Sequence, residues 1–167
     1  MVFGIDALIA LANSFGYLGV ILIGFLSSFL IFIPSPAWIA VFLLGAVMNP
    51  LLLGLAAGLG AAIGEMTGYG IGLGIQKLAA RRKKDIKKQV MKIKKLFGRY
   101  HPDLIIFVFA AAPILPIDAV GIFCGYIKYD KKRFFTFVLI GKIIKYILIA
   151  YAGFYGLNWV LHNVPLG

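Results

Sequence analysis

The sequence predicts an all-α integral membrane protein that is built as an inverted repeat of two units. Each unit is expected to hold a proline-broken re-entrant hairpin followed by a transmembrane helix, with a basic amphipathic interfacial helix between the units. Three observations carry this prediction. No charged residue occurs between Asp6 and Glu65, two hydrophobic segments are each broken by a pair of prolines, and most basic residues gather between those segments.

Length and composition place the chain in the bilayer. The 167 residues are 62% hydrophobic, which leaves room for three or four spans or hairpins and for no separate soluble domain. We therefore expect one membrane domain over residues 1–167. Its first unit is expected at 1–78, beginning with a short interfacial segment, its amphipathic helix at 79–101 and its second unit at 102–162.

A repeated motif distinguishes the two units. In each unit a proline pair is followed, at a similar distance, by glycines, an ionisable residue and a tyrosine. The matched residues are Pro36 and Pro116, Gly45 and Gly125, Gly64 and Gly141, Glu65 and Lys142, and Tyr69 and Tyr146. A chain with 20 glycines and 8 tyrosines produces such matches by chance, but the doubling of broken segment and motif together favours a repeat.

The distribution of basic residues predicts the orientation in the membrane. Eleven of the 17 Lys and Arg lie between Lys77 and Arg99, and a smaller basic cluster follows at 128–133. By the positive-inside rule, residues 79–101 and 128–133 are both expected to be cytoplasmic. A single crossing between them would put the second cluster outside, whereas a re-entrant hairpin with its tip at Pro113 and Pro116 keeps both on one side.

The orientation of the first unit follows from the cytoplasmic position expected for Lys77. A helix from about residue 50 to Lys77 would end inside, so the preceding segment can form a hairpin that enters from outside and has its tip at Pro34 and Pro36. The two units would then have opposite orientations, as in transporters that work by alternating access. The alternative is that residues 17–33 form an ordinary span and that Pro36 begins the next helix.

Residues 81–100 have the pattern of an amphipathic helix. Apolar residues recur at spacings of three and four, and basic residues occupy most other positions. We expect this helix to lie on the cytoplasmic leaflet and to bind anionic lipid headgroups. Nucleic acid is the rival partner for a net charge of +11, but it is not expected because the basic residues flank membrane segments and no base-stacking module is visible.

Ionisable residues inside the apolar segments are the candidates for function, because each is costly in the bilayer unless it is paired or hydrated. They are Glu65, Asp118, Lys142 and Lys145. Counting residues puts Glu65 and Lys145 at the same level, roughly 18 Å from the cytoplasmic ends of their helices. We expect Glu65 to neutralise Lys142 or Lys145 near the midplane, with Tyr69 and Tyr146 packed beside the charges.

Two interpretations of this pair stay open. A static ion pair would only hold the two halves together. A switchable pair would be opened by a headgroup phosphate that binds the lysines, or by a proton that neutralises Glu65. Asp118 follows the tip prolines of the second hairpin, where it can cap the outgoing half-helix or accept a proton or a cation.

Other classes of chemistry find no support in the sequence. It contains no Cys/His cluster, Walker loop or dinucleotide fingerprint, so neither a metal nor a cofactor is expected. Cys124 is the only cysteine, which rules out a disulfide within the chain. An intramembrane enzyme is not expected either, because no nucleophile, base or metal cluster is recognisable.

These motifs together resemble those of the DedA superfamily, also called VTT-domain or SNARE-associated Golgi proteins. The resemblance covers roughly residues 18–156. The residues that carry it are the Pro-x-Pro segment, Gly64-Glu65 with Tyr69 and Gly72, and the stretch from Pro113 to Gly125 that leads into Gly141-Lys142. The resemblance implies two opposed re-entrant hairpins and a role in moving lipids across the bilayer. Bacterial relatives are associated with polyprenyl-phosphate carriers and phospholipids, and eukaryotic relatives with phospholipid scrambling.

The chain departs from the family pattern where relatives often carry charges. Ala110 and Pro116 stand at the two arginine positions of the second hairpin, and Leu73 replaces a further arginine. If those family groups bind phosphate, this chain must use Lys142, Lys145 and Asp118 instead, or must have another substrate.

The resulting prediction is a multi-pass cell-membrane protein that moves a phosphate-bearing lipid, such as a polyprenyl phosphate or a phospholipid, across the bilayer. Coupling to protons and assembly into a homo-oligomer are left open. The alternative from the same charges is a proton- or ion-coupled transporter of a small solute. A scaffold that only gathers partners would not need the buried charges for its activity.

Overall fold

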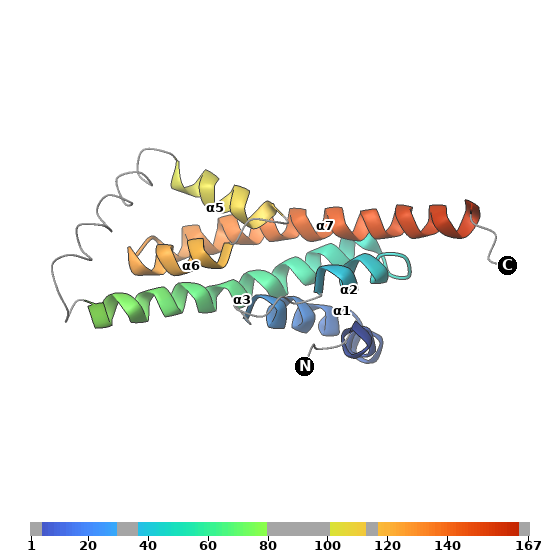
Figure 1. The fold of residues 1–167 in the computed structure, drawn as a ribbon, viewed down its shortest axis with the longest axis horizontal. Helices are drawn as coiled ribbons and strands as arrows, with labels where there is room; N and C mark the ends of the chain where they lie inside the picture. Colours follow the sequence, from blue (N-terminus) through green and yellow to red (C-terminus); the bar gives the residue numbers. More distant parts are fainter. Residues whose placement is uncertain (1–4, 30–36, 80–100, 113–116, 164–167) are drawn as a thin grey trace.

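The computed structural model describes residues 5–29, 37–79, 101–112 and 117–163. These residues form α-helices without any strand, which confirms the prediction of an all-helical protein (Figure 1). The helices are α1 (Ile5–Phe29), α2 (Ala37–Leu44), α3 (Pro50–Ala79), α5 (Pro102–Ala111), α6 (Ile117–Tyr126) and α7 (Lys131–Asn163). The tip prolines Pro34, Pro36, Pro113 and Pro116 and the expected amphipathic helix at 81–100 lie outside the described residues.

The two long helices, α3 and α7, form the axis of the molecule. They lie side by side and run in opposite directions (Figure 1). Among the described residues, the segments Pro50–Leu78 and Lys131–Gly156 are long and apolar enough to cross a membrane. Close approach depends on glycine, since a Cβ at Gly54 or Gly58 would stand 2.6 or 2.7 Å from the Cα atoms of Ile147 and Ile143.

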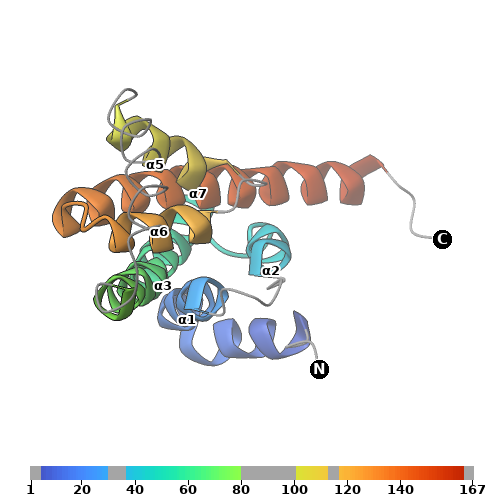
Figure 2. The ribbon, with the colours of Figure 1, turned by 60° about the vertical axis from the view of Figure 1, so that its left-hand side comes forward.

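The short helices form two pairs, and each pair divides its helices between the two long ones (Figures 1 and 2). In the first pair, α1 packs on the N-terminal half of α3 and α2 packs on the C-terminal half of α7. In the second pair, α5 packs on the N-terminal half of α7 and α6 packs on the C-terminal half of α3. The two pairs therefore cover opposite ends of the α3–α7 axis.

Helix α1 of the first pair is broken within its length. The helical path of α1 is interrupted at Gly16, whose φ of 57° and ψ of −135° are not helical. Among the described residues, the apolar helical segment Ser14–Ser28 contains this interruption. The helix before Gly16 begins at Ile5, within the N-terminal segment that we expected to be interfacial.

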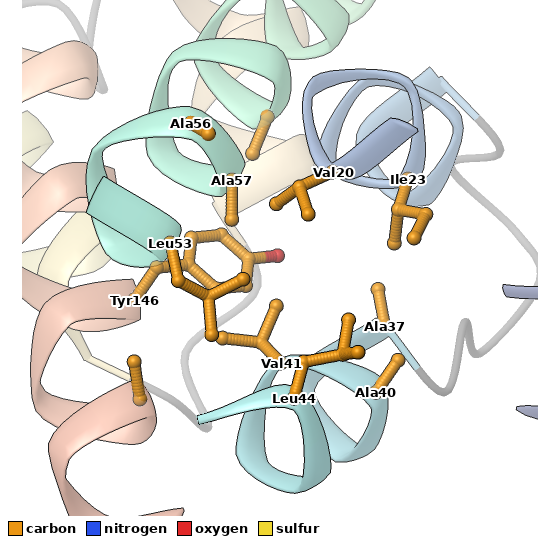
Figure 3. Packing of buried hydrophobic residues seen from close by; sticks show 12 residues of the cluster. Val20, Ile23, Ala37, Ala40, Val41, Leu44, Leu53, Ala56, Ala57 and Tyr146 are labelled. Carbon is orange, nitrogen blue, oxygen red and sulfur yellow. The ribbon is translucent and has the colours of Figure 1, made fainter. Parts of the chain in front are cut away.

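Each pair has its own buried cluster of apolar side chains. Figure 3 shows the first cluster, in which Tyr146 of α7 lies among Val20, Val41 and Leu53 of the first pair and α3. The second cluster joins α5 and α6 to Tyr69 of α3 and to the start of α7. The outer face of α3 instead exposes apolar residues at spacings of one, three and four, namely Leu51, Leu52, Leu55, Leu59 and Ile63. Such an exposed apolar face is expected where a helix contacts lipid.

Candidate functional site

A buried ion pair joins the two long helices. Nζ of Lys142 on α7 lies 3.0 Å from Oε2 of Glu65 on α3. Glu65 is 1% exposed and Lys142 is 5% exposed, so both charges have been removed from solvent. Removing one partner of such a pair would leave an uncompensated charge in an apolar interior. Of the two lysines that we expected to neutralise Glu65, Lys142 is the one in contact with it.

Small residues on α3 create the space for this pair. Glu65 lies between Gly64 and Gly68, and Ala61 and Ala62 are buried one turn before it. Because these residues have little or no side chain, α7 and α6 can approach α3 closely at the level of the carboxylate. The single carboxylate of α3 thus lies where the neighbouring side chains are smallest.

Glu65 faces the second pair with its other oxygen. A Cβ added at Gly121 of α6 would lie 3.4 Å from Oε1 of Glu65, which is an ordinary contact distance. Neither carboxylate oxygen accepts a well-aligned hydrogen bond from a residue that the structure describes. The attraction between Glu65 and Lys142 is therefore chiefly Coulombic.

Lys142 faces the first pair. Its ammonium group donates to Oγ of Ser28 in the last turn of α1, at 3.3 Å. Ser28 is 6% exposed, so this hydroxyl belongs to the same enclosed region as the ion pair. The adjacent hydroxyl, that of Ser27, lies 3.5 Å from the hydroxyl of Tyr146 on α7. The last turn of α1 therefore presents two hydroxyl groups to the polar face of α7.

Asp118 and Lys145 complete a group of four ionisable residues. Asp118 is half-buried in the first turn of α6, and it interacts electrostatically with Glu65, Lys142 and Lys145. Lys145 is half-buried as well, and its Nζ lies 6.0 Å from the centroid of the Tyr146 ring. The structure thus brings all four sequence-predicted ionisable residues together, while the role of each in function stays a prediction.

The two matched tyrosines serve different ends of the molecule. Tyr146 is buried in the first cluster, beside the lysines and Ser27. Tyr69 packs on Phe134 with ring centroids 5.2 Å apart, and its hydroxyl donates to the carbonyl of Tyr129 at 2.5 Å. Only Tyr146 therefore borders the lysines directly, whereas Tyr69 holds the turn between α6 and α7.

Sequence reasoning missed a polar network at that turn. The hydroxyl of Tyr129 donates to Oδ1 of Asp103 in the first turn of α5, and Arg133 of α7 lies 3.9 Å from Oδ2 of the same carboxylate. Burial, followed by the hydrogen bond to Asp103, raises the pKa of Tyr129 to about 12. Tyr129 and Arg133 are four residues apart across the start of α7, and this spacing was the sequence signal that both could contact one carboxylate.

Sequence reasoning also missed Ser28 and Gly121. Ser27 and Ser28 are adjacent serines in an otherwise apolar segment. Their presence was the sequence signal that α1 makes a polar contact. Gly121 carried no signal, because a glycine in an apolar helix is more often a packing residue than part of a site. Within the described ranges, no group of three or more His, Cys, Asp or Glu side chains lies close enough to hold a metal ion.

Comparison with known protein families identifies the chain. The family model of the VTT domain matches residues 33–155, about three quarters of the sequence. The chain belongs to the VTT-domain family. This is the domain of the DedA and SNARE-associated proteins, so the resemblance seen in the motifs is confirmed. Neither the curated proteins nor the solved structures gave a match.

Membership in this family indicates the class of protein to which the buried charges belong. VTT-domain proteins are membrane proteins associated with transport or with lipids, rather than with enzymatic activity. Together with two helices that can cross a bilayer, this makes the chain a membrane protein. The matched range includes the whole group of Glu65, Asp118, Lys142 and Lys145.

Proposed function

We propose that this VTT-domain protein moves a phosphate-bearing lipid, such as a polyprenyl phosphate or a phospholipid, across the bilayer. The observation that carries the proposal is the buried contact between Glu65 and Lys142, at the junction of the long helices and both short-helix pairs. Buried ionisable residues at such a junction mark substrate or proton paths in membrane proteins.

The arrangement of the pairs supports an inverted repeat of two re-entrant hairpins. Gly45, directly after α2, lies so close to α7 that a Cβ would collide with the carbonyl of Ala150, and Gly125 of α6 stands in the same relation to the carbonyl of Tyr69 on α3. These two glycines are matched in the repeat. Since α3 and α7 run in opposite directions, each unit inserts its second short helix against the long helix of the other unit. Such repeats allow alternating access to a central site.

The charges suggest how a headgroup is accepted. The two carboxylates and two ammonium groups sum to zero, so the empty site is neutral overall. A phosphate group would displace the carboxylate of Glu65 from Lys142 while the lipid tail stays in the bilayer. The added negative charge is costly in this interior unless a proton neutralises Glu65 or Asp118. Transport is therefore expected to depend on a pH gradient.

Exposed basic residues support the proposed orientation in the cell membrane. Lys131, Lys132 and Arg133 are all exposed at the start of α7. The start of α7 lies near the start of α5 and at the same end of the molecule as the end of α3, whose last turn contains Lys77. We place residues 79–101 and 128–133 in the cytoplasm, where residues 81–100 would bind anionic headgroups.

The alternative is a proton- or ion-coupled transporter of a small solute. The interaction between the Glu65 and Asp118 carboxyl groups favours it, because paired carboxyls are suited to accept a proton or a cation. This alternative predicts solute uptake without lipid movement, so the lipid assay separates the two functions.

The test is lipid movement in proteoliposomes that contain the purified full chain. A labelled phosphate-bearing lipid is followed with and without a pH gradient, for the wild type and for Glu65→Gln. The matched control is Asp130→Asn, which changes an exposed carboxylate that accepts from the backbone N–H of Arg133 far from the pair. We expect movement in the wild type and in the control, and at least a roughly ten-fold slower rate in Glu65→Gln. The absence of movement for every lipid tested in wild-type vesicles would contradict the proposal.

A further inference from the structure

The two hydroxyl groups at the end of α1 are not equivalent. The hydroxyl of Ser27 donates to the carbonyl of Gly24 at 2.7 Å, so its proton is used within its own helix. The hydroxyl of Ser28 instead accepts from Nζ of Lys142 at 3.3 Å. Two neighbouring serines thus provide one group that supports the helix and one group that contacts a buried cation.

The ammonium group of Lys142 is shared between the two halves of the site. It lies 3.0 Å from the carboxylate of Glu65 on α3 and 3.3 Å from the hydroxyl of Ser28 on α1. A lysine ammonium has three protons to donate, so it can keep its contact with Ser28 while its contact with Glu65 is exchanged. Lys145 lies one turn further along the same helix, and it adds a second positive charge that interacts with Lys142.

The acidic groups lie on the other side. Oε1 of Glu65 is directed toward Gly121, and Asp118 precedes Gly121 by one turn on α6. An anion would be repelled from this side and attracted to the side of the lysines. The site is therefore polarised, with its basic half at the first pair and its acidic half at the second pair.

We propose that Ser28 and Lys142, with Lys145 beside them, form an oxyanion subsite that holds the phosphate group of the ligand against the first pair. This inference rests on the proposed function and adds Ser28 as a residue that determines specificity. A phosphate oxygen accepts hydrogen bonds from an ammonium group and from a hydroxyl at the same time. Ser28 would hold Lys142 toward the first pair in the empty site, and would donate its own proton to the phosphate in the loaded site.

The test uses the full chain in detergent micelles and follows its thermal unfolding midpoint. The probes are short-chain phosphatidic acid, which carries a lipid-linked phosphate, inorganic phosphate, and a short-chain diacylglycerol without phosphate. A ligand that binds the folded state raises the midpoint in proportion to its affinity. The variants are Ser28→Ala, Ser28→Thr and, as the matched control, Ser27→Ala.

We expect phosphatidic acid to raise the midpoint of the wild type, and diacylglycerol to leave it unchanged. Ser28→Ala should weaken the apparent affinity by about ten-fold, as expected for one lost hydrogen bond to a charged group. Ser28→Thr should restore binding, and Ser27→Ala should stay within about two-fold of the wild type, because its hydroxyl serves the helix. The same pattern with inorganic phosphate alone would assign the subsite to a free phosphate instead of a headgroup.

Equal affinity of wild type and Ser28→Ala for phosphatidic acid would overturn the subsite and leave the transporter proposal intact. An equal loss in both alanine variants would overturn it too, because the effect would then be structural. Should the wild type bind neither phosphate probe, the subsite is wrong, and lipid movement in proteoliposomes decides separately whether the transporter proposal also fails.

Discussion

The two short-helix pairs occupy matched positions but present opposite chemistry to the centre. The first pair offers a neutral hydroxyl, that of Ser28, to a lysine of α7. The second pair offers Asp118 and the bare backbone of Gly121 to the carboxylate of α3. The comparison teaches that two helix pairs can pack on the long helices in similar ways and still contribute different polar groups to the site, with lysines and a hydroxyl at the first pair and carboxylates at the second.

The pairs also differ in how they are anchored at their outer ends. The second pair is held by hydrogen bonds of Tyr129, whose hydroxyl donates to Asp103 of α5 and whose carbonyl accepts from Tyr69 of α3. At the corresponding turn between α2 and α3, the side chain of Asn49 accepts from the backbone N–H groups of Leu51 and Leu52, so it caps its own helix. We infer that the second pair is the fixed part and that the first pair moves more readily.

The largest expected effect comes from breaking the ion pair of Glu65 and Lys142, which joins α3 to α7. Glu65→Gln leaves the buried ammonium of Lys142 uncompensated and should destabilise the fold by roughly 3–5 kcal/mol. Combining it with Lys142→Met removes both charges and should recover most of that stability, measured by thermal unfolding. Transport should not recover, because the site can no longer bind a phosphate. Full transport by the double variant would show that the pair is only structural, and would favour a scaffold.

The next effect tests whether the two pairs pack alike. Gly125→Ala places a Cβ against the carbonyl of Tyr69, and Gly45→Ala places one against the carbonyl of Ala150, so each should cost about 1–3 kcal/mol in unfolding free energy. Gly70→Ala is the matched control, because a Cβ there meets nothing within 4 Å. A loss of stability at only one of the two glycines would show that the two helix pairs do not pack alike.

The sequence allowed much of this arrangement to be predicted. Charged residues in an apolar segment must find partners, so counting residues to the cytoplasmic ends was enough to expect Glu65 opposite the lysines. The sequence did not predict that α2 packs on α7 and α6 on α3, because this packing depends on contacts such as that of Gly45 with Ala150, which no local pattern encodes.

The missing part of the site has a physical reason. A serine in an apolar helix can satisfy its hydroxyl on its own backbone, as Ser27 does, and Thr67 does the same with the carbonyl of Gly64 at 2.7 Å. Sequence alone therefore cannot tell which of two adjacent serines contacts Lys142. Only the rotation of α1 against α7 selects Ser28.

A smaller effect concerns the anchor of the second pair. The pKa of Tyr129 is raised to about 12, so the folded state keeps its proton where the unfolded chain, with an ordinary pKa near 10, loses it. Stability should therefore fall as pH rises from about 10 to about 12. The difference between wild type and Tyr129→Phe in thermal unfolding isolates this contribution. A difference that does not change over this range would mean that the phenol is not held by Asp103.

The smallest expected effect is a difference in local opening. If the second pair is fixed by its anchor, backbone amides in α5 and α6 should exchange hydrogen more slowly than those in α1 after Gly16 and in α2. Hydrogen exchange read by mass spectrometry on the full chain in micelles would compare them. Tyr129→Phe should speed exchange in α5 and leave α2 unchanged, and an equal increase in both would contradict a local anchor.

The central claim is that the Glu65–Lys142 pair opens to receive a phosphate group. Solid-state NMR of the full chain in bilayers tests it directly, with ¹³C in glutamate carboxyls, ¹⁵N in lysine ammonium groups and the ³¹P of phosphatidic acid. The Lys142 signal is assigned by its loss in Lys142→Met. We predict a short ¹³C–¹⁵N distance in phosphate-free lipid that lengthens when phosphatidic acid is added, together with a new ³¹P contact to Lys142. An unchanged ¹³C–¹⁵N distance with no ³¹P contact would contradict the account.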